Sequence, residues 1–258
     1  MNSPPCAKKF STFCAMIDAH LHVTEELLPY VQDILCIPNA DNPVEYVFLH
    51  QQGFPYISAG IHPWKADCTD WEEMEPILRT VPVIGEIGLD NVWCKVDPDI
   101  QRQVFHRQLA LAAQLRKPVI LHTKGMEQEV LETIRSYPNR YLVHWYACEE
   151  HLQEYIDFGC WFTVGPDVRL NPAVETAART VPLDRLLIES DGLDGIAWGQ
   201  GTTRSPTDYP QAMTRHLQTV AKLRNMDAAA LLQQMERNFR TFLQQPQVAL
   251  QDAGTMLY

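Results

Sequence analysis

The segment PVILHTKGMEQEVLETIRSYPNRYLVHW, residues 118–145, decides the fold class. Its two apolar runs, Val119–Leu121 and Tyr141–Val143, predict buried strands, and the stretch between them predicts a helix over Glu127–Ser136. A strand, a helix and a second strand in this order form a βαβ unit, in which the two strands are parallel. The chain is therefore expected to have an α/β fold.

Apolar runs of the same kind recur along the chain and alternate with helical patterns. The runs that predict strands are Ala15–Asp18, Ile34–Ile37, Tyr56–Ala59, Val81–Ile87, Val119–Leu121, Tyr141–Val143, Cys160–Val164 and Leu186–Ile188. Further helices are predicted over Pro98–Lys117, Glu149–Phe158, Tyr209–Leu223 and Asp227–Leu243. Eight βα units predict a closed (β/α)₈ TIM barrel. The stretch Gly192–Thr207, rich in Gly, Thr and Pro, is expected to be the longest loop and to lie over the barrel mouth.

Composition narrows the range of functions. The 258 residues carry a net charge of -11, which argues against an extended surface that coats nucleic acid. The seven cysteines are odd in number and contain no C-x-x-C pair, so they predict a reduced protein of the cytoplasm. We find no membrane-spanning run or secretory segment in this sequence, and no membrane association is expected. Residues 1–15 are expected to be an extension and 16–258 a single domain.

Ionisable side chains stand at the carboxyl ends of the predicted strands. In a barrel these strand ends converge on one mouth, so the side chains are expected to form one site. The pair His20 and His22, two apart on a strand, would face the same side. The group consists of His20, His22, Glu86, His122, His144 and Asp191.

This set exceeds what one tetrahedral metal site takes, so the sequence predicts two divalent ions. A carboxylate must bridge them, and Glu86 and Asp191 are both candidates at this point. Imidazole and carboxylate ligands suit zinc, manganese or magnesium better than a metal that prefers thiolates. Glu189 has the same strand parity as Asp191, so it is predicted either to support a histidine or to fill a layer of the barrel interior.

Six segments resemble, in order and spacing, the TatD family of metal-dependent hydrolases within the amidohydrolase superfamily. They are MIDAHLH (16–22), AGIHPW (59–64), VIGEIGLD (83–90), PVILH (118–122), YLVHW (141–145) and VPLDRLLIESD (181–191). The resemblance runs from about Met16 to Leu243. It implies a distorted TIM barrel and, for most members of known activity, a metal-dependent deoxyribonuclease that works as a 3′ to 5′ exonuclease.

The resemblance also implies roles for individual residues. One ion would be held by His20, His22, Glu86 and Asp191, and the other by Glu86, His122 and His144. Glu86 would bridge the two ions, Asp191 would orient or deprotonate the attacking water, and His62 would contact the substrate.

Further substrate contacts are expected from chemistry. Lys124 can supply a point charge to a phosphate. Trp145, and also Trp64, can stack on a terminal base, although packing within the barrel or its loops explains either tryptophan equally well. The expected partner is a nucleic-acid end or a nucleotide.

Three functions remain open from the sequence. The first is a phosphodiesterase of the deoxyribonuclease type that trims single-stranded ends. The second keeps the metals and hydrolyses an amide, ester or lactone. The third is a metal-binding scaffold or regulatory subunit that acts through partner proteins.

Overall fold

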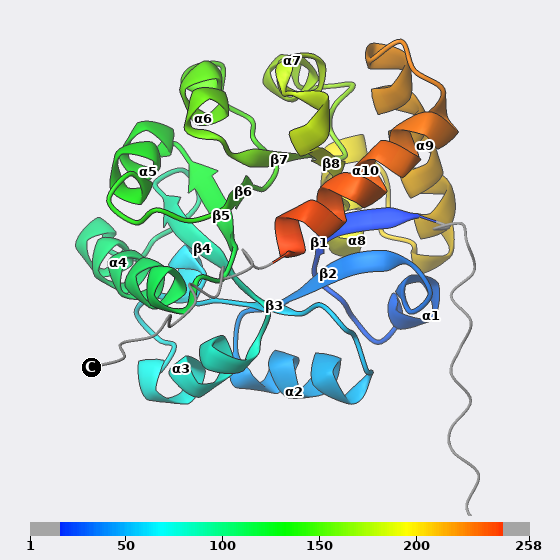
Figure 1. Ribbon diagram of the computed structural model, residues 1–258. Helices are drawn as coiled ribbons and strands as arrows, with labels where there is room; N and C mark the ends of the chain where they lie inside the picture. Colours follow the sequence, from blue (N-terminus) through cyan, green and yellow to red (C-terminus); the bar gives the residue numbers. More distant parts are fainter. Residues whose placement is uncertain (1–15, 245–258) are drawn as a thin grey trace, which may run out of the picture.

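The structure, a computed structural model, describes residues 16–244. Its parallel strands follow one another around a barrel in chain order (Figure 1). The strands are β1 Ile17–Leu21, β2 Leu35–Ala40, β3 Ser58–Ala59, β4 Val83–Asp90, β5 Val119–Lys124, β6 Tyr141–Val143, β7 Trp161–Val164 and β8 Leu186–Ile188. The predicted TIM barrel is confirmed, and it is distorted because β3 contributes only two residues.

Helices surround the barrel (Figure 1). They are α1 Leu28–Val31, α2 Pro43–Gln51, α3 Trp71–Thr80, α4 Pro98–Leu115, α5 Glu127–Ile134, α6 Leu152–Phe158, α7 Pro172–Thr180, α8 Gly192–Gln200, α9 Tyr209–Leu223 and α10 Ala228–Leu243. Short 3₁₀ turns cover Pro63–Lys65, Leu183–Arg185 and Pro206–Asp208. Within the described range we find no helix that is both long and apolar enough to cross a bilayer.

The first and last strands meet through hydrogen bonds at the end of β8. The Asp191 backbone N–H donates to the His20 carbonyl at 3.2 Å, and the Ser190 N–H donates to the Asp18 carboxylate at 2.9 Å. These bonds bring the Asp191 turn against β1, although the two residues are far apart in the chain.

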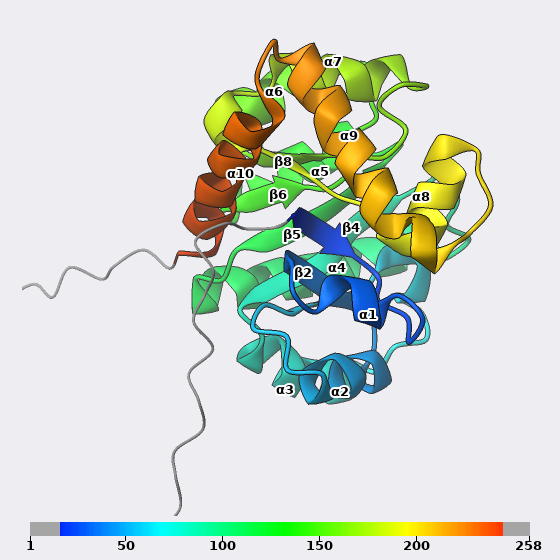
Figure 2. The same ribbon diagram turned by 90° about the vertical axis from the view of Figure 1, so that its right-hand side faces the viewer.

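Helix α10 covers the amino-terminal end of the barrel. Phe239 packs edge-on against Tyr56, which precedes β3, and Asn238 donates hydrogen bonds to the carbonyls of Leu183 and Leu186 at the start of β8. Helix α8 starts beyond the carboxyl end of β8 and lies on the opposite side of the barrel from α10 (Figure 2). The strand ends that carry the predicted site are therefore on the α8 side.

Several predicted boundaries were wrong. Strands β1, β2, β4 and β5 continue beyond the apolar runs, so polar residues such as His20 and His122 lie within strands. The backbone ladder continues through them because its hydrogen bonds do not depend on side-chain polarity. Helix α6 begins at Leu152 rather than Glu149, and the predicted 1–15 extension and the last residues of the predicted 16–258 domain lie outside the described range.

The prediction of a loop over Gly192–Thr207 was also wrong for its first half, which forms α8. The helix contains three glycines because neighbouring chain approaches it closely. A Cβ on Gly195 would meet the Ser190 carbonyl at 2.5 Å, and one on Gly199 would meet the Asp167 amide nitrogen at 3.0 Å. Glycine lowers helix propensity, so this glycine-rich sequence predicted a loop. In the structure its glycines allow neighbouring chain to pack closely against the helix.

Candidate metal centre

The carboxylate of Glu86, buried on β4, lies at the centre of the predicted ligands and presents one oxygen to each of two histidine groups. Its Oε2 is 3.3 Å from His20 Nε2 and 3.7 Å from His22 Nε2. Its Oε1 is 2.5 Å from His122 Nδ1 and 2.8 Å from His144 Nε2. One carboxylate thus joins imidazoles from β1 to imidazoles from the ends of β5 and β6.

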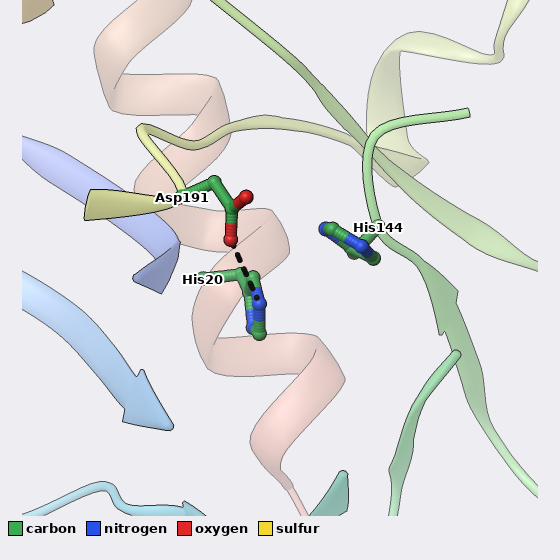
Figure 3. A group of neighbouring side chains, drawn as sticks. All are labelled: His20, His144 and Asp191. Carbon is green, nitrogen blue, oxygen red and sulfur yellow. Dashed lines mark ion pairs between the residues drawn. The ribbon is translucent and has the colours of Figure 1, made fainter. Parts of the chain in front are cut away.

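Asp191 completes the β1 side of the cluster. Its Oδ1 is 3.4 Å from His20 Nε2 and 3.7 Å from His22 Nε2. Figure 3 shows the Asp191 carboxylate directed at His20, with the His144 ring nearby. Asp191 occupies the N-cap position of α8, but its side chain makes no capping hydrogen bond to the described helix. The carboxylate is therefore left to the site rather than used to cap the helix.

The turn that carries Asp191 is held by buried groups behind it. Asp191 has a left-handed backbone, with φ of 56°. The Ser190 hydroxyl accepts a hydrogen bond from the Gly192 N–H at 2.9 Å and donates one to the buried Asp18 carboxylate at 2.5 Å. Tyr209 on α9 donates to the same carboxylate at 2.8 Å. This network fixes where the Asp191 side chain points.

Two further carboxylates support the histidines from behind. Glu189 Oε1 is 3.3 Å from His144 Nδ1, and Asp90 Oδ2 is 3.1 Å from His122 Nε2. A histidine whose second nitrogen binds a carboxylate has a fixed ring orientation and is a stronger metal ligand. Of the two interpretations of Glu189, the structure favours the histidine partner. Sequence reasoning missed Asp90, although its two-residue spacing from Gly88 and four-residue spacing from Glu86 place it on the same strand face.

The cluster fits divalent cations. Both ring nitrogens of His20 and the Oδ1 of Asp191 are buried and have no hydrogen-bond partner among the described residues. Buried polar atoms normally have partners, and His20 Nε2 and Asp191 Oδ1 lie 3.4 Å apart, so these two atoms together are suited to bind a cation. Imidazole nitrogens and carboxylate oxygens are the donors that zinc and manganese accept. His20, His22, His122, His144, Glu86 and Asp191 are the residues that could hold such ions.

The electrostatics of the site also favour cations. Burial opposes the charged form of each group, but the surrounding imidazoles hold the pKa of Glu86 well below its usual range. Burial likewise disfavours the charged imidazoles, yet Glu86 raises the pKa of His144 to about 10 and of His22 to about 9. The buried carboxylates thus stabilise positive charge strongly, and protons and divalent ions compete for the same nitrogens.

A cavity of about 350 Å³ opens onto this cluster, and the predicted substrate contacts His62, Lys124 and Trp145 all line it. His62 Nε2 is 3.4 Å from Glu86 Oε1, and its Nδ1 accepts a hydrogen bond from the Trp64 N–H at 3.2 Å. Trp145 is only 7% exposed, and its Nε1 donates to Asp167 at 2.7 Å. Trp145 therefore has the packing role that the sequence left open, as well as a place in the cavity wall.

The residues of the cavity wall that were missed from the sequence include Trp93, Trp198 and Arg204. They lie on the loop after β4, on α8 and on the loop after α8. No strand-end pattern identifies such positions, since they reach the cavity only when the loops fold over the mouth.

The chain is similar to known metal-dependent hydrolases and nucleases. A family model described as TatD related DNase matches residues 17–244. The chain is 29% identical over 202 residues to the 3′-5′ ssDNA/RNA exonuclease TatD of Edwardsiella piscicida, a match that covers 72% of this chain and 77% of that protein. It is also 29% identical over 154 residues to the metal-dependent hydrolase YabD of Bacillus subtilis, covering 55% of this chain and 60% of that protein, less than two thirds of its length.

Solved structures share the fold. The crystal structure of YjjV, a TatD homologue from Escherichia coli K12, superposes with a TM-score of 0.75 at 22% identity and covers 89% of this chain and 98% of that chain. A hydrolase of the TatD family from Entamoeba histolytica gives a TM-score of 0.71 at 14% identity, covering 90% of this chain and 99% of that chain. With the family model spanning nearly all of the described residues, the chain belongs to the TatD family of metal-dependent hydrolases.

Proposed function

We propose that the chain is a metal-dependent phosphodiesterase of the nuclease type, which removes nucleotides from the 3′ end of single-stranded nucleic acid. The observation that carries this proposal is the position of Glu86, whose Oε2 faces His20 and whose Oε1 faces His122 and His144. A relative with 29% identity is named a 3′-5′ ssDNA/RNA exonuclease, which supports the proposal of a phosphodiester substrate and of removal from the 3′ end.

In this proposal His20, His22, Glu86 and Asp191 hold one divalent ion, and Glu86, His122 and His144 hold the other. Two such ions, when bound, stabilise the attacking and leaving oxygens of a phosphoryl transfer and lower the pKa of a water molecule. With the two cations bound, the site is suited to an anionic substrate. The net charge of -11 does not prevent this, because the charge close to the site governs binding there.

Asp191 is proposed to accept the proton of the attacking water. Its Oδ1 is free of hydrogen bonds to described residues, and the side chain lines the cavity at 25% exposure. The imidazoles around it keep its pKa low in spite of burial, so the carboxylate is available as an acceptor at neutral pH. His62 and Lys124 are proposed to contact the scissile phosphate group, His62 from beside Glu86 and Lys124 from the end of β5.

The shape of the cavity supports action on ends. A cavity of about 350 Å³ is at the small end of the range for ligand sites, and it suits one nucleotide rather than a wrapped duplex. The cysteine pattern of the sequence supports the cytoplasm as the proposed compartment.

A hydrolysis panel tests this proposal. Protein loaded with zinc or manganese is incubated with 5′-labelled single-stranded DNA, the matching RNA, duplex DNA, closed circular single-stranded DNA, nucleotides, and simple esters and lactones. We expect a ladder of shortened 5′-labelled strands and release of mononucleotides, with full loss of activity in chelator. Rapid cutting of the circles would overturn the exonuclease assignment, and hydrolysis of esters or lactones alone would overturn the phosphodiesterase assignment.

A further inference from the structure

Three tryptophans form a continuous chain of ring contacts across the cavity mouth, and we call Trp93, Trp198 and Trp145 the tryptophan arc. The ring centroids of Trp93 and Trp198 are 5.6 Å apart, and those of Trp198 and Trp145 are 5.4 Å apart, both in edge-to-face geometry. All three side chains line the cavity that contains the metal-ligand cluster. The arc connects the loop after β4 to α8 and to the end of β6.

Two members of the arc, Trp93 and Trp198, are unusually exposed for tryptophan. Trp93 is 50% exposed and Trp198 is 59% exposed, although they contact each other. Tryptophan is highly buried on average, and adjacent exposed aromatic groups beside a cavity mark a ligand site. About half or more of the surface of each side chain is thus exposed beside the cavity, where a planar group can contact it.

The arc rests on a rigid support. The Trp145 indole is anchored through Nε1 to Asp167 at 2.7 Å, and its ring packs so closely on Gly165 that a Cβ there would overlap it. On the other side, the Lys124 ammonium lies 5.6 Å from the centroid of the Trp93 ring. A preorganised aromatic surface loses little conformational entropy when it binds a ligand.

Cationic side chains accompany the arc in the same cavity wall. Lys65, Lys124 and Arg204 all line the cavity. Arg204 is shared between Glu26 and Asp194, so its charge is partly compensated, while Lys124 faces Trp93. A ligand that suits both features has a planar ring joined to an anionic group, which is the chemistry of a nucleotide.

We propose that Trp93 and Trp198 bind the nucleobase of the terminal nucleotide by stacking, while its phosphate lies toward the metal-ligand cluster. This inference rests on the proposed nuclease function and adds the base to what the site recognises. Trp145 acts only as a support for Trp198. Every base has an aromatic face, so the site accepts all four bases but discriminates against a sugar phosphate that lacks a base.

The first experiment measures binding rather than turnover. Calorimetry on the metal-loaded protein compares dAMP with 2-deoxyribose 5-phosphate, which carries the same phosphate and sugar without a base. Stacking on tryptophan predicts that dAMP binds about tenfold or more tightly. Equal affinities of the two ligands for the parent protein would overturn the inference.

Variants then locate the effect. Trp93→Ala and Trp198→Ala are expected to weaken dAMP binding by about tenfold and to leave the affinity for 2-deoxyribose 5-phosphate unchanged. Trp198→Leu keeps an apolar side chain on α8 and is used if the alanine variant unfolds, with the same expectation. The matched control is Trp71→Ala, which removes a tryptophan on α3 that does not line the cavity. A dAMP preference that survives in both site variants, or that the control also removes, would contradict the assignment.

A second measurement separates this inference from the proposed function. The parent protein is given single-stranded DNA that ends either in a normal 3′ nucleotide or in a 3′ abasic residue. Faster removal of the normal nucleotide supports both proposals. Equal rates on both ends retain the nuclease function and overturn base stacking. If neither strand is cut while dAMP still binds better than the sugar phosphate, the nuclease proposal fails and the base site stands.

Discussion

The carboxylate of Asp90 joins His122 to the loop that carries Trp93. Its Oδ2 accepts hydrogen bonds from His122 Nε2 at 3.1 Å and from Trp64 Nε1 at 2.6 Å. Its Oδ1 accepts from the backbone N–H groups of Val92 and Trp93 at 2.8 and 2.9 Å. With Nε2 bound in this way, His122 presents Nδ1 to Glu86. One buried aspartate therefore orients a proposed metal ligand and the start of the tryptophan arc.

Asp90→Asn is expected to weaken metal binding at the His122 side by about 10- to 100-fold, because the amide no longer offers a charged acceptor to Nε2–H. Titration with a competing chelator measures this affinity, and excess metal should restore much of the activity. Asp99→Asn, at an exposed carboxylate on α4 paired with Arg102, is the control. An unchanged metal affinity in Asp90→Asn would show that Asp90 only shapes the loop.

Gly88→Ala tests why β4 carries a glycine next to the site. Gly88 has φ of +158°, and a Cβ there would overlap the His122 carbonyl oxygen. Backbone strain and overpacking together are expected to cost about 3 kcal/mol or more of unfolding free energy. Gly53→Ala is the matched control, since Gly53 also has a positive φ but a Cβ there meets no described atom within 4 Å. Urea denaturation measures both variants, and equal losses in the two would refute the role of close approach.

Residue patterns predicted the barrel and the proposed metal ligands because both depend on strand periodicity. A strand fixes which residues share a face, and a barrel fixes where strand ends meet, so His20, Glu86 and His122 could be brought together from sequence alone. Trp93 and Trp198 could not, since their positions depend on how the loop after β4 and helix α8 fold over the mouth. Helix α8 was missed because its glycines, which serve close packing, carry the signature of a loop.

His216→Gln is expected to reduce the loss of stability in acid. Burial lowers the pKa of His216 to about 4. The 2.8 Å hydrogen bond between His216 Nε2 and the Val164 carbonyl acts in the opposite direction and raises the pKa, but its effect is smaller. The unfolded chain binds a proton near pH 6.5 and the folded chain does not, so the free energy of unfolding falls as pH drops from about 6.5 towards 4.

Glutamine can keep the hydrogen bond to Val164 without titrating. Between pH 7.5 and 5 the variant should therefore lose about 2 kcal/mol less unfolding free energy than the parent. Urea denaturation at both pH values measures the difference. An identical pH dependence in the two proteins would mean that His216 is not the group responsible.

Asp191→Asn separates catalysis from binding. Asparagine keeps the shape and one oxygen near His20 but loses the charged proton acceptor, so turnover is expected to fall by about 10²- to 10⁴-fold. The thermal midpoint should stay nearly unchanged, and at least one ion should remain bound. Turnover that stays within a few fold of the parent would contradict the role of Asp191 as proton acceptor.

Metal content per chain tests the two-ion centre most directly. Elemental analysis is made on the reconstituted parent and on His20→Ala, His122→Ala and Glu86→Gln, with circular dichroism to verify folding. Because the Glu86 oxygens face the two histidine groups separately, we predict about two divalent ions in the parent, about one in each histidine variant and the largest loss in Glu86→Gln. A reconstituted parent that holds no ion, or one ion that all three substitutions remove alike, would contradict the two-ion centre.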